Sequence, residues 1–149
     1  MSEPLRKTLR VRCGQERAFR VFTAQLDRWW PPDHRRLPGS RLELEGRVGG
    51  RFVERAGDRE VEHGRVLRWE PPTRLTYSWF PGGGTGPTEV DVRFVGEGDH
   101  TRVEVVHAEA RSGLSDAWPE RVAVFARNWA AVLDGYVQAV EAADEGGGA

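Results

Sequence analysis

Towards its C-terminus the chain carries one long run of apolar residues at helical spacing, and this run strongly limits the folds open to the sequence. Pro119 and Glu120 suit the first turn of a helix. The N–H groups of that turn have no partner within the helix, so proline loses nothing there, and the positive end of the helix dipole favours an acidic side chain. A helix over residues 119–141 would be about 34 Å long at ~1.5 Å per residue, enough to cross a small sheet. Its apolar face would carry Val122, Phe125, Trp129, Val132, Leu133, Tyr136 and Val140.

The part of the chain before this helix alternates apolar and polar residues with a period of two, which is typical of strands with one buried face. Turns rich in glycine and proline separate these stretches, and such short connections favour antiparallel neighbours. The expected strands cover residues 5–11, 41–44, 51–55, 60–70, 75–79, 90–94 and 103–107. The expected turns and loops lie at residues 49–50, 56–58, 71–72, 81–87 and 96–99.

A second helical pattern follows the first expected strand. Ala18, Phe19, Phe22 and Leu26 recur at helical spacing within residues 15–26. Two prolines at 31–32 end this region, because a proline ring clashes with the preceding turn and has no N–H to donate. Residues 33–40 are expected to form a loop. The length of 149 residues suits a single domain, which we assign to residues 1–142, with residues 143–149 as a disordered tail.

These elements predict an α+β protein in which one long helix covers the apolar face of a six- or seven-stranded antiparallel sheet. A helix is roughly 10 Å across, so it is narrower than several strands that lie ~4.8 Å apart. A twisted sheet can curl around such a helix and leave space beneath it. The side chains expected on the inner face are bulky and aromatic, as in pockets that bind small molecules.

Five segments carry a resemblance to a known superfamily: Trp30-Pro31-Pro32, Val48–Phe52, His63–Trp79 (HGRVLRWEPPTRLTYSW), Thr101–His107 and Asn128–Leu133. In this order, over roughly residues 5–142, they resemble the SRPBCC superfamily, also called START or Bet v 1-like, and within it the heat-shock-protein-90 ATPase activator homologue-like branch. The resemblance implies a helix-grip fold, a curved antiparallel sheet of six to seven strands around a long C-terminal helix, with two short helices after the first strand. Its relatives range from ligand carriers to polyketide aromatase/cyclases, so the fold alone does not fix the function.

The space expected between sheet and helix gives the candidate ligand-binding residues. Helical spacing directs Phe125 and Trp129 toward the sheet. His107 has the parity of the apolar side of its strand, where it could orient a ligand, transfer a proton, or pack as a core histidine. Trp30 and Trp118 are expected at opposite lips, whereas His34 and His100 are expected in solvent. The full set is Trp30, Phe52, His63, Tyr77, Trp79, Phe94, Val105, His107, Trp118, Phe125, Trp129 and Leu133.

Charge and ligand chemistry argue against several classes of function. The 22 basic residues, all arginine except Lys7, are interleaved with 23 acidic ones, for a net charge of −1. With no excess of positive charge, binding to nucleic acid would release few counterions, so we expect no nucleic-acid partner. The four histidines are scattered and Cys13 is the only cysteine, so no pair has the spacing of zinc ligands. We predict no metal and no cofactor, and the sequence has no G-x-S-x-G motif of a serine hydrolase.

The same features bear on location and assembly. Apolar runs are far shorter than the ~20 residues that span a bilayer, so we expect no membrane partner. The first residues lack the continuous apolar stretch of a signal peptide. One cysteine cannot form an internal disulfide and fits a reducing compartment, so we expect a cytoplasmic protein. Exposed edge strands would be compatible with a homodimer.

Three functions fit these expectations. The first is a non-catalytic carrier or sensor that binds an apolar or aromatic small molecule, because no catalytic constellation is evident. The second is a cyclase or hydrolase-like enzyme that uses His107, Tyr77 and an arginine on a polyketide-type substrate. The third is an interaction module for a chaperone or regulator, suggested by the many charged residues.

Overall fold

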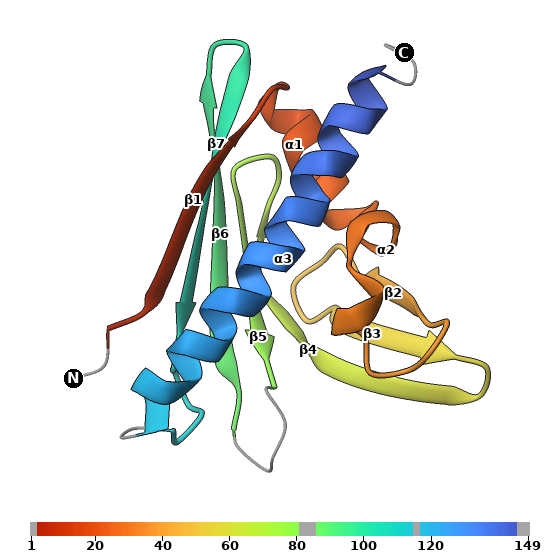
Figure 1. The fold of residues 1–149 in the computed structure, drawn as a ribbon, viewed down its shortest axis with the longest axis vertical. Coiled ribbons are helices and arrows are strands. Elements are labelled where there is room, and N and C mark those ends of the chain that lie inside the picture. Colours follow the sequence, from red (N-terminus) through yellow and green to blue (C-terminus); the bar gives the residue numbers. More distant parts are fainter. Residues whose placement is uncertain (1–2, 81–85, 115–116, 146–149) are drawn as a thin grey trace.

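A computed structural model describes residues 3–80, 86–114 and 117–145, and Figure 1 shows a curled sheet with a long helix lying diagonally across it. The strands are β1 (Leu5–Val11), β2 (Arg41–Leu44), β3 (Arg51–Ala56), β4 (Arg59–Glu70), β5 (Arg74–Trp79), β6 (Thr88–Glu97) and β7 (His100–Ala108). The helices are α1 (Gln15–Thr23), α2 (Leu26–Trp29), the 3-10 helix η1 (Pro32–His34) and α3 (Trp118–Glu145).

All seven strands belong to one antiparallel sheet in the order β1-β7-β6-β5-β4-β3-β2. From β2 to β7 the chain forms a meander in which each strand pairs with the next. The first strand, β1, pairs instead with the last, β7, from Leu5 opposite His107 to Val11 opposite Thr101. The predicted α+β helix-grip architecture is therefore confirmed.

The long strand β4 is where the sheet changes direction. Its pairing with β3 shifts register between Phe52 and Val53, and its pairing with β5 shifts between Val66 and Arg68. Such bulges bend a strand and increase its twist. Figure 1 shows the result, since β2, β3 and the adjoining part of β4 turn away from the plane of β5, β6 and β7. The bend gives the sheet the concave face that α3 crosses.

Aromatic rings fill one half of the space between sheet and helix. Phe94 on β6 packs edge-on against Phe19 and Phe22 of α1, with ring centroids 5.2 and 5.7 Å apart. Tyr136 of α3 packs against Phe22 at 5.1 Å, and its hydroxyl donates a hydrogen bond to the carbonyl of Ala18 at 2.8 Å. Helix α1 is thus the wedge that closes this end of the interior.

Several predicted boundaries differ from the structure. The two short helices that the resemblance implies are present, but the helical pattern over residues 15–26 ends as α1 at Thr23, and α2 begins at Leu26, because Gln25 between them leaves the helical conformation (φ −106°, ψ 21°). The loop over 33–40 begins with η1, whose first residue is Pro32. Helix α3 starts at Trp118 and continues to Glu145, so it is longer than the helix predicted over residues 119–141. Residues 81–85 of the expected hairpin loop and 146–149 of the expected tail lie outside the described residues.

Two contacts fix α3 on the sheet. A Cβ atom on Gly135 would collide with the carbonyl oxygen of Trp29, so glycine lets α2 and α3 approach closely here. At the other end, the indole of Trp118 donates a hydrogen bond to the carbonyl of Glu3 at 2.8 Å. Within the described ranges, no helix combines the length and apolar character needed to cross a bilayer.

Candidate functional site: a pocket under the C-terminal helix

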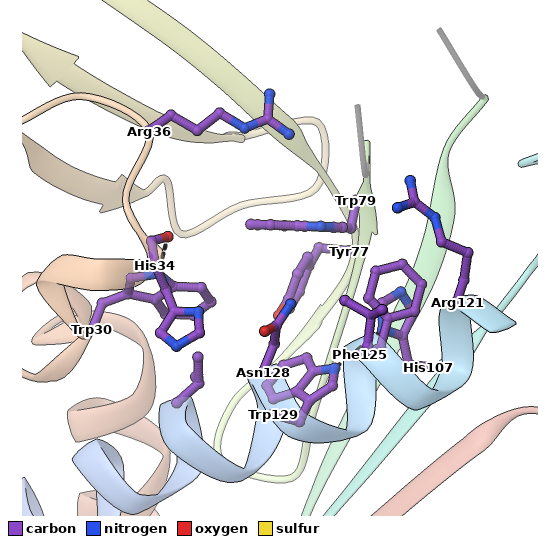
Figure 2. A pocket seen from close by; sticks show the side chains of 12 residues that line it. Trp30, His34, Arg36, Tyr77, Trp79, His107, Arg121, Phe125, Asn128 and Trp129 are labelled. Atoms are coloured by element: carbon purple, nitrogen blue, oxygen red, sulfur yellow. Dashed lines mark hydrogen bonds between the residues drawn. The ribbon is translucent and has the colours of Figure 1, made fainter. Parts of the chain in front are cut away.

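A partly open pocket of about 210 Å³ lies between the sheet and the N-terminal half of α3 (Figure 2). Strands β5 and β7 form its floor, α3 forms one wall, and the segment between α2 and β2 forms the other. The volume is below the ~300 Å³ of pockets for drug-sized ligands but above the ~150 Å³ of a cavity that holds benzene. The lining residues are Trp30, His34, Arg36, Tyr77, Trp79, His107, Arg121, Val124, Phe125, Asn128, Trp129 and Val132.

Aromatic rings from α3 and β5 line the inner part of the pocket. Phe125 and Trp129 are four residues apart and share a helix face, and both are buried. Tyr77 and Trp79 are two residues apart and share a face of β5. Burial raises the pKa of Tyr77, so its phenol stays protonated. The expected orientation of Phe125 and Trp129 toward the sheet is confirmed.

His107 lies at the bottom of the pocket in a chain of three hydrogen bonds. The indole N–H of Trp129 donates to His107 Nδ1 at 3.1 Å, which places the imidazole proton on Nε2. Nε2 then donates to Thr88 Oγ1 at 2.7 Å, and the Thr88 hydroxyl donates to the carbonyl of Trp79 at 2.8 Å. Every donor and acceptor in this chain has one consistent direction.

The surroundings of His107 keep its ring neutral. Burial lowers the pKa of His107 to about 4, because a charged imidazolium would lose its hydration in this environment. The ring also packs against Phe125, with centroids 4.5 Å apart. Since both nitrogens are occupied, His107 can take a proton from a substrate only if its hydrogen bond with Trp129 breaks. The residue therefore acts as a structural link between β7, β6 and α3.

Four polar or charged side chains form the outer rim of the pocket. His34 and Arg36 come from the segment between α2 and β2, and Arg121 and Asn128 come from α3. The guanidinium of Arg36 donates to the carbonyl of Phe80 at 3.2 Å. Arg121 lies over the ring of Phe125, with Cζ 5.8 Å from the ring centroid. An apolar interior with a wet, polar rim suits an amphipathic ligand.

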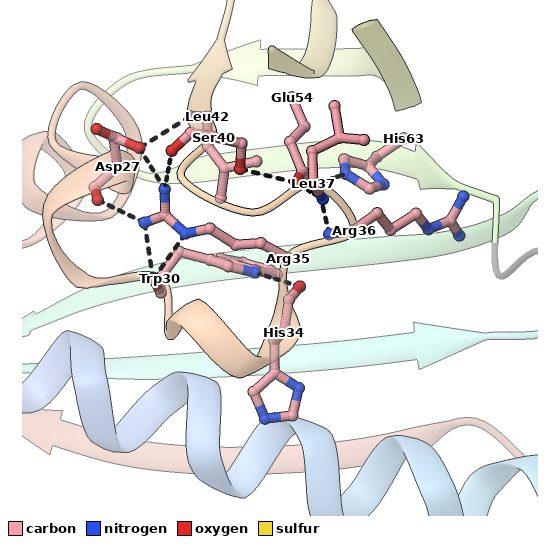
Figure 3. A network of polar contacts seen from close by, with 10 residues as sticks. All are labelled: Asp27, Trp30, His34, Arg35, Arg36, Leu37, Ser40, Leu42, Glu54 and His63. Atoms are coloured by element: carbon pink, nitrogen blue, oxygen red, sulfur yellow. Dashed lines mark hydrogen bonds and ion pairs between the residues drawn. The ribbon is translucent and has the colours of Figure 1, made fainter. Parts of the chain in front are cut away.

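The segment that supplies Trp30, His34 and Arg36 is anchored by a buried carboxylate (Figure 3). The carboxylate of Glu54 accepts hydrogen bonds from the backbone N–H groups of Leu37 at 2.7 Å and Arg36 at 3.1 Å. It also accepts hydrogen bonds from the Ser40 hydroxyl at 2.7 Å and from His63 Nε2 at 2.8 Å. Burial alone would raise the pKa of Glu54, but these hydrogen bonds outweigh it and lower the pKa to about 2.

Arg35 ties the two ends of the same segment together. Its guanidinium donates to the carboxylate of Asp27 at 2.7 Å and to the backbone carbonyls of Trp30 and Ser40, both at 2.8 Å. Asp27 in turn accepts a hydrogen bond from the backbone N–H of Leu42 at 2.9 Å, at the start of β2. Glu54 and Arg35 therefore fix this segment and, with it, one wall of the pocket.

Half of the predicted ligand-binding residues line the pocket. These are Trp30, Tyr77, Trp79, His107, Phe125 and Trp129. The other half, Phe52, His63, Phe94, Val105, Trp118 and Leu133, lie outside it. A position on the inner face of the sheet or helix does not by itself place a residue in the pocket, because α1 and other aromatic rings already occupy part of that face.

All six outlying residues are buried, and their surroundings explain their place. Phe52 lies behind Tyr77 and Trp79, with centroids 5.4 and 5.3 Å away. Phe94 belongs to the half filled by α1, and Val105 and Leu133 are buried in the same core. Trp118 is not at a lip of the pocket: its ring is buried against His107 and Phe125, and its indole N–H bonds the carbonyl of Glu3.

His63 is also separated from the pocket by an aromatic ring. It stacks on Trp79 with centroids 4.7 Å apart and planes 9° apart, while Nε2 bonds Glu54. Burial lowers the pKa of His63, and the nearby Glu54 only partly compensates, so the ring is neutral. Its Nδ1 has no hydrogen-bond partner among the described residues.

Sequence reasoning missed His34, Arg36, Arg121, Val124, Asn128 and Val132. The four from α3 could have been found, because they flank Phe125 and Trp129 at helical spacing. His34, which was expected in solvent, and Arg36 reach the pocket through the fold of their segment, and no local pattern announces that. No group of three or more histidine, cysteine, aspartate or glutamate residues within the described part of the chain could hold a metal ion.

A scan against protein families finds one that covers most of the chain. The model of the family described as Activator of Hsp90 ATPase homolog 1-like protein matches residues 12–141. No curated protein gives a significant match.

Solved structures with the same fold come from proteins of diverse description. An anthrahydroquino-gamma-pyrone synthase, Txn09, is 34% identical with a TM-score of 0.53, over 83% of this chain and 87% of that one. CalU16 from Micromonospora echinospora is 24% identical with a TM-score of 0.66, over 91% and 74%. PFC0360w, an HSP90 activator from Plasmodium falciparum, is 19% identical with a TM-score of 0.54, over 79% and 86%. The last two likenesses show the fold alone.

Proposed function

The chain belongs to the family of Activator of Hsp90 ATPase homolog 1-like proteins, within the SRPBCC fold, and we propose that it binds a small aromatic molecule without covalent chemistry, as a carrier or sensor. The observation that carries this proposal is the pocket of about 210 Å³ between the sheet and α3. Aromatic side chains from α3 and β5 line its inner part, where both ring nitrogens of His107 are already hydrogen-bonded, and its charged groups lie at the rim. That combination is typical of sites that bind amphipathic small molecules.

The size of the pocket supports a ligand of one or two fused rings. A cavity of ~150 Å³ holds benzene, a single ring. The pocket here, at about 210 Å³, is somewhat larger. Phe125 and Trp129 on one side and Tyr77 on the other would contact the faces or edges of a flat ligand. Such aromatic contacts add about 0.5–1.5 kcal/mol each beyond the area they bury.

The state of His107 favours binding over proton-transfer catalysis. A general base needs a free acceptor and a pKa near the working pH. His107 has neither, because Trp129 occupies Nδ1 and burial lowers the pKa to about 4. The enzyme hypothesis in which His107 is the base is therefore disfavoured.

A ring-forming enzyme is the second candidate, and the identity of 34% with an anthrahydroquino-gamma-pyrone synthase favours it. In this pocket the protonated phenol of Tyr77 would be the available proton donor. Turnover of a polyketide-type substrate that survives in His107→Gln but falls in Tyr77→Phe would support this candidate. The third hypothesis, a chaperone partner, is supported by the description of the family and by the fold shared with the HSP90 activator.

Plugging the pocket tests the binding function. Asn128 is exposed on α3 and lines the pocket, so Asn128→Trp would fill the mouth with little effect on the core. The neighbouring Arg127 is also exposed but does not line the pocket, so Arg127→Trp is the matched control. The probe is 2-naphthol, a neutral two-ring molecule, measured by titration calorimetry and native mass spectrometry.

We expect one probe molecule per wild-type chain and the same affinity in Arg127→Trp. Asn128→Trp should bind at least about tenfold more weakly, which corresponds to about 1.4 kcal/mol. Failure of the wild type to bind, or equal binding by both variants, would remove the proposal.

A further inference from the structure

The charges around the pocket are unbalanced. None of the twelve lining residues is acidic, whereas two of them, Arg36 and Arg121, carry a permanent positive charge. The chain as a whole has a net charge of −1. The positive charge at the pocket is therefore a local feature and not a reflection of the overall composition.

Among the described residues, about half of the other arginines form an ion pair with an acidic side chain. Arg55 pairs with Glu43 and Glu60, and Arg74 pairs with Asp91. In the described part of the chain, Arg36 and Arg121 form no ion pair. Among the described residues, the Arg36 guanidinium donates to the Phe80 carbonyl, and the Arg121 guanidinium lies over the Phe125 ring. A guanidinium has five N–H donors, so both groups keep donors free for another partner.

Arg121 lies at the positive end of the α3 dipole, in the same first turn as the acidic Glu120. It is the fourth residue of α3 and therefore lies in the first turn. The aligned peptide dipoles make that end of the helix positive, so a cation there is disfavoured and an anion is favoured. The contact with Phe125, at 5.8 Å, holds the guanidinium beside the pocket.

Arg36 is held near the same opening by different contacts. Its backbone N–H bonds the buried Glu54 at 3.1 Å, and its guanidinium bonds the carbonyl of Phe80 at 3.2 Å. Figure 2 shows the Arg36 and Arg121 side chains extending toward the end of the pocket where Trp79 lies. Apolar walls beside an opening strengthen the field of such charges, because they lower the local dielectric constant.

Building on the proposed function, we infer that the ligand is an aromatic carboxylate whose rings lie among Tyr77, Phe125 and Trp129 and whose charged group lies at the rim with Arg36 and Arg121. The apolar body then replaces water in the inner pocket. The carboxylate stays at the wet edge, where it keeps part of its hydration and gains two guanidinium partners.

The experiment compares 2-naphthoate with 2-naphthamide, which has the same rings and no charge. Titration calorimetry at low salt should show that the wild type prefers naphthoate by about tenfold, the difference that one or two charge-assisted hydrogen bonds provide. Arg36→Gln and Arg121→Gln should each reduce this preference by about threefold, and the double variant should abolish it. Arg127→Gln, with the same loss of charge elsewhere on α3, should keep it.

The possible results separate this inference from the proposed function. Binding of neither compound removes the proposed function itself. Equal binding of both compounds leaves that function in place and overturns the carboxylate inference. A preference that falls as much in Arg127→Gln as in Arg121→Gln also overturns it, because the effect would then come from overall charge. A preference that weakens with added salt in the wild type and is absent in the double variant at every salt concentration supports it.

Discussion

At the residue scale, His107 shows how a histidine in a pocket can be structural. A neutral imidazole has one donor and one acceptor. Here the Thr88 hydroxyl oxygen accepts from the donor, Nε2, and the indole N–H of Trp129 donates to the acceptor, Nδ1. The three residues come from β7, β6 and α3, so the ring joins the floor of the pocket to its wall. A proton on His107 would break this arrangement and would also be poorly solvated, and that explains the depressed pKa.

We predict that the buried ring of His107 stays neutral, with its proton on Nε2, from about pH 8 to about pH 5. Nitrogen-15 NMR of the imidazole reports both the tautomer and the titration. The pKa falls from the ordinary 6.5 to about 4 on folding, so between these two pH values the unfolded chain binds more protons than the folded one. The free energy of unfolding should therefore decline as the pH falls from 6.5 toward 4. The same ring in urea should titrate near the ordinary value. A folded-state midpoint near 6.5 would contradict the hydrogen-bond chain.

At the element scale, the segment between α2 and β2 is the part of the pocket least evident from sequence. It has little regular structure beyond η1, yet it is fixed by Arg35 and by the buried Glu54. Glu54 lies on β3, so one buried carboxylate connects the sheet to the pocket wall. Because this carboxylate accepts four hydrogen bonds, its charge is compensated without a cation at contact distance.

We predict that Glu54→Gln lowers the free energy of unfolding by about 2–4 kcal/mol near neutral pH, because an amide cannot accept all four hydrogen bonds. The pKa of Glu54 falls from 4.5 to about 2 on folding, so its stabilisation is full above about pH 4.5 and is lost as the pH drops toward 2. The gap between wild type and variant should shrink accordingly.

Urea unfolding at several pH values measures this gap. Glu43→Gln is the matched control, because Glu43 is exposed and pairs with Arg55 at 2.7 Å, so its loss should cost less than about 1 kcal/mol. Equal effects of the two substitutions would show that Glu54 does not anchor the segment.

The difference between local sequence patterns and contacts of distant residues explains what the sequence could predict. Strand periodicity and the apolar face of α3 are local patterns, and they located Tyr77, Trp79, Phe125 and Trp129 correctly in the pocket. The rim depends on contacts between distant residues, such as Glu54 with Leu37, and no spacing rule reveals them. Trp118 was misplaced for a related reason, because its indole partner is Glu3, at the opposite end of the chain.

At the scale of the whole molecule, the space between the curled sheet and α3, here called the grip, is filled in one half and open in the other. Helix α1 inserts Phe19 and Phe22 beneath one half of α3, where Tyr136 completes the packing. Beneath the other half no such wedge is present among the described residues, and the pocket remains. A single helix cannot fill the concave face of a seven-stranded sheet, so the position of α1 decides where the space is left.

The most direct test of this account is a map of intermolecular nuclear Overhauser effects between 2-naphthoate and isotope-labelled protein. We predict contacts from the naphthalene protons to Tyr77, Phe125 and Trp129, and none to Phe94, which lies in the filled half. Contacts confined to exposed apolar residues such as Leu67, or spread through the Phe94 cluster, would contradict the claim that the open half of the grip is the binding site.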